Sequence, residues 1–218
     1  MRASGFRTSV IASLLAVVTI TANAKLGHPQ SVGQTKIEKP VRDVNEADYR
    51  LSPSKDVAMN LSGTTPVKNW SMTAHGLNGD ARMDVSKDRH LVGINSLNFS
   101  LPVLNLKGEQ HAMDEDAYTA LKADTYKDIV FKLTSATVEP QSDGFYTIEA
   151  LGKLTVAGVT KTVTLKMRSQ VACDGSIAFT GSENVKMSDY NVERPSHFFG
   201  IIKAGDDMTL SYTLIFTK

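Results

Sequence analysis

Residues 152–165 read Gly-Lys-Leu-Thr-Val-Ala-Gly-Val-Thr-Lys-Thr-Val-Thr-Leu. Apolar and polar side chains alternate on both sides of Ala157-Gly158, and a period of two is the pattern of β-strands. Glycine reaches positive φ at little steric cost, so this pair can reverse the chain within two residues. The stretch predicts a β-hairpin, and a second turn at Gly205-Asp206 predicts the start of a final strand.

The same alternation recurs along most of the chain, with Thr, Ser, Lys and Arg between the apolar positions. Each strand then has one buried and one solvent-exposed face, which is typical of antiparallel sheets. One segment has helical spacing instead, with apolar residues at Met113, Ala117 and Leu121. We expect a helix over residues 115–123 with Asp114 as its N-cap. These elements predict an all-β fold, a closed antiparallel β-barrel of about eight strands with one short α-helix, because closure removes unpaired strand edges.

The N-terminus has the features of a secretory signal peptide. Arg2 and Arg7 precede an apolar run at residues 10–20, and Ala22-Asn23-Ala24 supplies small side chains at the expected cleavage site. The run is shorter than the roughly 20 apolar residues that a membrane-spanning helix needs. We expect residues 1–24 to be removed, which predicts a periplasmic or secreted protein without a stable membrane anchor.

Residues 25–47 contain few large apolar side chains, so we expect a flexible leader followed by one domain at residues 48–218. Loss of the signal peptide removes two arginines and no acidic residue, which takes the formal net charge from +1 to −1. A near-neutral chain lacks the basic surface that nucleic-acid binding requires. Cys173 is the only cysteine, so an intrachain disulfide is excluded, and we expect its side chain to be buried.

Catalytic and metal-binding motifs are missing from the sequence. The five histidines are dispersed, so we expect no metal site and no cofactor. Acidic residues cluster at Asp114-Glu115-Asp116, where they suit the start of the expected helix better than acid/base chemistry. The chain has no Gly-x-Ser-x-Gly, no phosphate-binding glycine loop and no His-Glu-x-x-His. These observations favour a protein that is not an enzyme.

Several short segments together resemble a known family. They are Leu154-Thr155-Val156 with Gly158-Val159-Thr160-Lys161 at the hairpin, Tyr49-Arg50-Leu51, Asn69-Trp70-Ser71-Met72 and Leu101-Pro102-Val103. In this order they resemble the YceI-like family of bacterial lipid-binding proteins, over roughly residues 49–218. The resemblance implies a lipocalin-like barrel that encloses an apolar isoprenoid-type lipid, such as a quinone or a polyprenyl phosphate.

The apolar interior can be read in two ways from the residues alone, because a small barrel either fills its centre with side chains or keeps room for one ligand. The resemblance favours the hollow barrel, with Phe198 and Phe199 at its mouth. Two functions follow: a binding protein that transports, stores or sequesters a lipid, and a packed periplasmic interaction or stress module without a lipid. Oligomers are compatible with both. The residues predicted to contact a ligand are Trp70, Met72, Phe99, Leu101, Phe131, Leu133, Leu165, Phe179, Phe198, Phe199 and Leu214.

Overall fold

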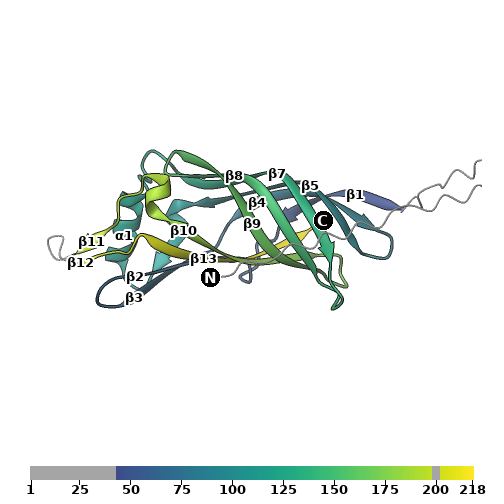
Figure 1. Ribbon diagram of the computed structural model, residues 1–218, viewed down its shortest axis with the longest axis horizontal. Helices are drawn as coiled ribbons and strands as arrows, with labels where there is room; N and C mark the ends of the chain where they lie inside the picture. The colour runs from purple at the N-terminus through teal and green to yellow at the C-terminus, as the bar shows by residue number, and fades with distance from the viewer. Residues whose placement is uncertain (1–42, 198–201) are drawn as a thin grey trace, which may run out of the picture. The chain divides into compact units, whose positions relative to one another are not determined.

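The computed structural model describes residues 43–197 and 202–218, so the expected signal peptide, most of the expected leader, Phe198 and Phe199 lie outside the described residues. The described chain is mostly β-strand (Figure 1). Its elements are β1 Val44–Leu51, β2 Ala58–Thr64, β3 Asn69–Ala74, β4 Asn78–Ser86, β5 Leu91–Pro102, the 3-10 helix η1 Val103–Asn105, β6 Leu106–Gly108, α1 His111–Ala120, β7 Asp128–Pro140, β8 Tyr146–Val156, β9 Val159–Val171, β10 Ile177–Lys186, the 3-10 helix η2 Met187–Tyr190, β11 Ser196–His197, β12 Ile202–Lys203 and β13 Asp207–Thr217.

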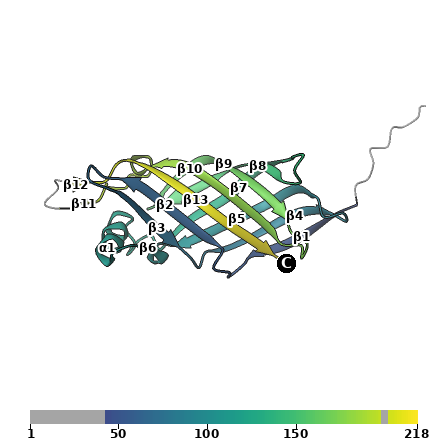
Figure 2. The same ribbon diagram turned by 90° about the horizontal axis from the view of Figure 1, so that it is seen from below.

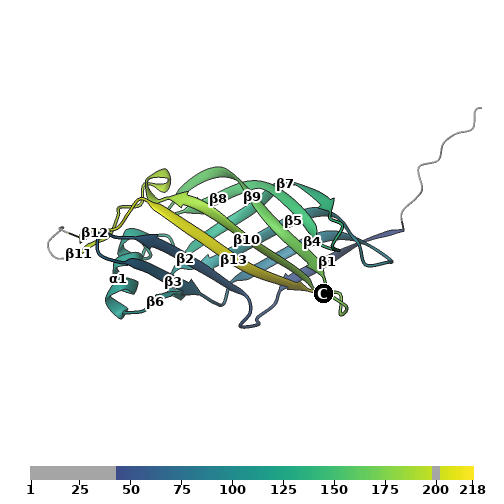
Figure 3. The same cartoon turned by 60° about the horizontal axis from the view of Figure 1, so that its bottom comes forward.

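Eight antiparallel strands form a closed barrel in the order β1-β4-β5-β7-β8-β9-β10-β13. The barrel closes where β13 pairs with β1, at Arg50 with Thr217 and Leu51 with Phe216. Strands β2, β3 and β6 extend the sheet from the opposite end of β13 (Figure 2). The helix α1 lies at that end, which we call the α1 end, and the other is the β1 end (Figure 3). The predicted fold class is confirmed.

The hairpin of residues 152–165 forms as expected. Strands β8 and β9 pair continuously up to Val156 and Val159, with a two-residue loop between them. Ala157 and Gly158 both have positive φ, at 47° and 82°, as the tight hairpin turn requires. Along β8, buried and exposed residues alternate, so the period of two correctly assigned the inner face.

Two expectations were wrong, one about where the barrel domain begins and one about the burial of Cys173. Strand β1 begins at Val44, so the last residues of the expected leader belong to the barrel. Val44 pairs with Ser86 through the backbone, and such pairing needs no apolar side chains. Cys173 is exposed in the turn between β9 and β10, because the sheet ends before it and leaves nothing to cover it.

The helix differs from the prediction at both ends. It runs from His111 to Ala120, with Gln110 at the N-cap position. Asp114 lies in the first turn and is buried, and its carboxylate accepts a hydrogen bond of 2.7 Å from the N–H of Gly108. Asp114 therefore ties the helix to β6 instead of capping it, a role that depends on a donor outside the helix.

Side chains fill the β1 end of the barrel. Phe179 and Phe216 pack edge to face with ring centres 5.8 Å apart, and Leu214 and Ile148 are completely buried beside them in the core. The alternative in which side chains fill the centre of the barrel is therefore correct for this half, which we call the packed half.

Candidate functional site

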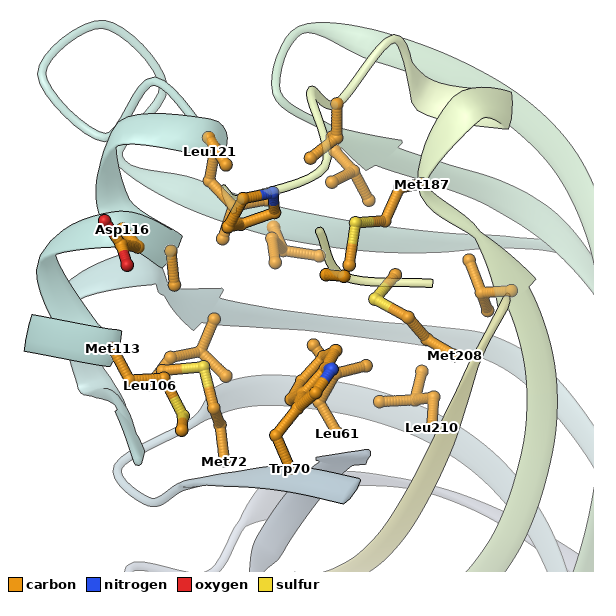
Figure 4. A pocket seen from close by; sticks show the side chains of 18 of the residues that line it. Leu61, Trp70, Met72, Leu106, Met113, Asp116, Leu121, Met187, Met208 and Leu210 are labelled. Atoms are coloured by element: carbon orange, nitrogen blue, oxygen red, sulfur yellow. The ribbon is translucent and has the colours of Figure 1, made fainter. Parts of the chain in front are cut away.

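The α1 end of the barrel encloses a cavity of about 500 Å³. This volume lies within the roughly 300–1,000 Å³ of typical small-molecule sites. Side chains from β2, β3, α1, η2 and β13 converge on it (Figure 4). Its wall is largely apolar; the aliphatic and methionine side chains include Met59, Leu61, Met72, Leu101, Leu106, Met113, Ala117, Leu121, Ile129, Leu154, Val156, Leu165, Val185, Met187, Val192, Met208 and Leu210.

Two interruptions of the sheet make room for this cavity. Strand β6 pairs with β3 and forms the edge of the sheet, and α1 packs against β6 and η1 beside that edge. Strands β9 and β10 pair only as far as Met167 with Gly181 and then separate. The 3-10 helix η2 contacts both strands where they separate. The cavity is therefore bounded by strands on most sides and by α1 and η2 where the strands diverge.

Hydrogen bonds hold α1 in this position. The Tyr118 hydroxyl donates to the carbonyl of Leu106 at 2.9 Å and accepts a bond of 2.6 Å from Lys107 Nζ. This bond raises the pKa of Lys107, because it favours the charged amine. Asp114 lies on the same side of the helix, 3.5 Å from Lys107 Nζ. The face with Met113 and Ala117 is left to line the cavity.

Methionine is concentrated in the cavity wall. Of the seven methionines in the described chain, Met83 and Met167 lie outside the wall; the other five, Met59, Met72, Met113, Met187 and Met208, line it. A thioether side chain is unbranched and polarisable, so it adapts to the shape of a guest at little cost. Such a wall suits a flexible apolar molecule better than a rigid polar one.

Two uncharged polar groups in the wall, on Trp70 and Tyr212, are shielded from solvent. Within the described residues, neither Nε1 of Trp70 nor the hydroxyl of Tyr212 has a hydrogen-bond partner. Burial, and to a lesser extent the nearby Glu183, raises the pKa of Tyr212, so this group stays a neutral hydroxyl. Both atoms are packed against the backbone, Trp70 Nε1 at Gly63 and the Tyr212 hydroxyl at Gly181.

Five of the predicted contact residues line the cavity: Trp70, Met72, Phe99, Leu101 and Leu165. Phe198 and Phe199 lie outside the described residues. The lining residues still await a ligand-binding measurement, so their contact with a ligand stays a prediction.

Four predicted residues do not line the cavity: Phe131, Leu133, Phe179 and Leu214. Phe131 stacks on Phe99 at 5.1 Å and lies directly over Gly152, which has no side chain to keep the ring out. Leu133 precedes a bulge in β7, and Phe179 and Leu214 belong to the packed half. The prediction that these four side chains face the barrel interior is correct. Their position along the barrel axis, outside the cavity, was not predicted.

Sequence reasoning missed the contributions of α1, η2 and the start of β13. The helical spacing of Met113, Ala117 and Leu121 marked an apolar face without showing what it covers. Met187 and Met208 are neighbours of two residues that are hydrogen-bonded to each other, Ser188 and Asp206. The Asp206 carboxylate accepts hydrogen bonds of 2.9 Å from the Ser188 N–H and 2.6 Å from the Ser188 hydroxyl, which holds both methionines at the wall. These bonds lower the pKa of Asp206. Asp206 thus lies in the bend before β13, as expected, and its carboxylate also binds η2.

Two absences concern the described residues, one of a metal-binding cluster and one of a membrane-spanning helix. Residues 43–197 and 202–218 contain no cluster of three or more His, Cys, Asp or Glu side chains arranged to hold a metal ion. No helix in this part of the chain is long and apolar enough to cross a membrane.

Known structures share the barrel. BcnA of Burkholderia cenocepacia superposes with a TM-score of 0.59 at 19% identity, covering 77% of this chain and 99% of its own. A polyisoprenoid binding domain from Saccharophagus degradans superposes with a TM-score of 0.56 at 11% identity, covering 77% and 97%. No curated protein sequence matches the chain. Residues 49–216 match the family model of the YceI-like domain. The chain therefore belongs to the YceI-like family.

Proposed function

We propose that this protein is an extracytoplasmic binding protein, not an enzyme, that holds an isoprenoid-type lipid in the cavity at the α1 end for transport, storage or sequestration. The observation that carries the proposal is an apolar cavity of about 500 Å³ inside a barrel whose other half is packed. The polyisoprenoid binding domain of Saccharophagus degradans has the same fold and supports the ligand class. The signal-peptide pattern of residues 1–24 supports the location.

Apolar burial alone can supply the affinity. Each C5 unit of a prenyl chain contributes a few kcal/mol when it leaves water, at about 0.8 kcal/mol per CH₂. A cavity of about 150 Å³ holds one benzene ring of six carbons. On that scale, 500 Å³ holds roughly 20 carbons, or about four C5 units. No reacting group is needed for such binding.

The test is native mass spectrometry of protein purified from the cell envelope of its own host. We expect a bound mass that organic extraction removes and that lipid analysis identifies as a prenyl compound. Rebinding should strengthen from C10 to C20 chains and gain little beyond C20. A lipid-free native protein that also fails to bind C15 and C20 prenyl compounds would support the interaction module instead.

A further inference from the structure

The wall of the cavity is interrupted lengthwise between β9 and β10. In the described chain, no strand pairing joins these two strands beyond Met167 and Gly181. We call the separated stretches, residues 159–166 of β9 and 182–186 of β10, the seam. Both stretches contribute side chains to the cavity wall, so the seam runs along the cavity itself.

The side chain of Glu183 bridges the seam where it begins. If the ladder continued in register, Lys166 would pair with Ser182. Instead, the backbone N–H of Lys166 donates a hydrogen bond of 2.6 Å to the carboxylate of Glu183. Among the described residues, this is the one hydrogen bond that joins the two sides of the seam.

Glu183 occupies a position where an apolar residue is expected. It alternates with exposed neighbours on β10 and is half-buried, in line with Phe179 and Val185, which face the barrel interior. A carboxylate on this side of a strand is unfavourable without a donor. The bond to Lys166 supplies that donor, and a hydrogen bond to a charged group is among the stronger ones in proteins.

The 3-10 helix η2 covers the seam. It follows β10 directly and contacts β9 as well. Its Met187 and Tyr190 side chains are buried and line the cavity, and Figure 4 shows Met187 pointing into it. The side-chain hydrogen bonds of η2 run from Ser188 to Asp206, in the bend before β13. Within the described residues, η2 is therefore held against β9 by packing alone.

The boundary at α1 is held by more hydrogen bonds than the seam. Asp114 accepts a bond from the Gly108 N–H at 2.7 Å, and the Tyr118 hydroxyl donates to the Leu106 carbonyl at 2.9 Å. Lys107 adds a bond to the same hydroxyl and an ion pair with Asp114.

Backbone bonds also cross the end of the barrel. The Gly205 N–H donates to the Thr64 carbonyl at 2.7 Å, and the Ala204 N–H donates to the Pro195 carbonyl at 2.9 Å. Local opening of a folded protein is favoured where the fewest interactions must break. Of these three boundaries, the seam has the fewest hydrogen bonds to break.

We propose that a guest enters and leaves the cavity through the seam when η2 moves away from β9, and that Glu183 is the residue that holds the seam closed. The inference rests on the proposed function, to which it adds the route of the lipid and a residue that controls its rate of exchange. Glu183 does not line the cavity. Because opening precedes both entry and exit, easier opening should accelerate both by the same factor and leave the affinity unchanged.

The experiment measures association and dissociation rate constants of the neutral fluorophore N-phenyl-1-naphthylamine by stopped flow. Glu183→Ala removes the acceptor of the bond across the seam, and Glu183→Gln keeps an uncharged one. Asp114→Ala is the matched control, because it removes the corresponding carboxylate-to-backbone bond at α1, and Asp114 does not line the cavity either.

Hydrogen exchange of the Lys166 amide, followed by NMR without ligand, reports opening of the seam itself. Circular dichroism confirms that each variant is folded. Asp114→Asn takes the place of Asp114→Ala if the alanine variant unfolds.

In Glu183→Ala, we expect both rate constants to rise roughly tenfold or more, the factor for losing one hydrogen bond to a charged group. The dissociation constant should stay within about twofold of wild type, and exchange of the Lys166 amide should accelerate by a factor similar to that of the rates. Glu183→Gln should give an intermediate increase. Asp114→Ala should change the rate constants by no more than about twofold, because Tyr118 still holds α1.

Faster amide exchange at Lys166 with unchanged rate constants in Glu183→Ala would show that the guest passes elsewhere, and would overturn the inference. Unchanged amide exchange would also overturn it, because Glu183 would then not hold the seam closed. A larger acceleration in Asp114→Ala than in Glu183→Ala would move the route to α1. Failure of wild type to bind both the fluorophore and C20 prenyl chains would instead contradict the proposed function itself.

Discussion

Introducing the same bulky residue at two depths of β13 tests whether the barrel is half hollow. Leu210 and Leu214 face inward from one strand, four residues apart. Leu210 lines the cavity, whereas Leu214 is completely buried in the packed half, paired with Phe179. Leu214→Phe overfills a close-packed region and should cost about 1–3 kcal/mol. At roughly 2–4 °C per kcal/mol for a domain of this size, the melting temperature falls by about 2–12 °C.

Leu210→Phe places its added volume in open space, so we expect less than about 0.5 kcal/mol of lost stability. The measurement is thermal unfolding of delipidated protein, followed by circular dichroism. Binding of N-phenyl-1-naphthylamine should show the opposite order, with a marked loss in Leu210→Phe and little change in Leu214→Phe once it is folded. Equal destabilisation by both substitutions would show that the α1 end is packed in solution and would refute the cavity.

Trp70 is the single tryptophan, so saturation with an apolar ligand should shift the emission of the native protein to shorter wavelength; an unchanged spectrum would contradict its place in the wall. Gly144→Ala should cost about 1–2 kcal/mol in urea unfolding, because φ there is 81° and the added Cβ meets nothing within 4 Å. Gly158→Ala should cost about the same, because φ there is 82° and the exposed Tyr126 ring that its Cβ would meet can move aside; a much larger cost would show that this ring is held in place. The pKa of Asp206 is lowered from 3.8 in the folded protein. The hydrogen bonds from its carboxylate to Ser188 of η2 therefore contribute fully to stability above pH 3.8, and this contribution is lost as the pH falls through the lowered pKa of the folded state. Ligand release measured by stopped flow should accelerate below pH 3.8 in wild type and respond less to acid in Asp206→Asn, in which the acid-sensitive carboxylate is absent.

The sequence by itself determined the strands, their inner faces and the main hairpin. These properties depend on neighbours in the chain. Alternation along β8 is a local pattern, and Ala157-Gly158 carries its turn conformation within two residues. The family also followed from short local motifs, and the match over residues 49–216 confirms it. The closed barrel followed because exposed edges of so many strands would otherwise stay unpaired.

Only the tertiary structure decided which part of the interior is hollow. Phe99 and Phe131 both point inward, yet Phe99 lines the cavity while the Phe131 ring packs against Gly152 and does not reach the cavity. That difference arises between strands that are far apart in sequence. The separation of β9 from β10 beyond Met167 is also visible only in the tertiary structure. A period of two fixes the direction of a side chain, but the space in front of it depends on what the opposite wall contributes, and that is set by packing across the whole barrel.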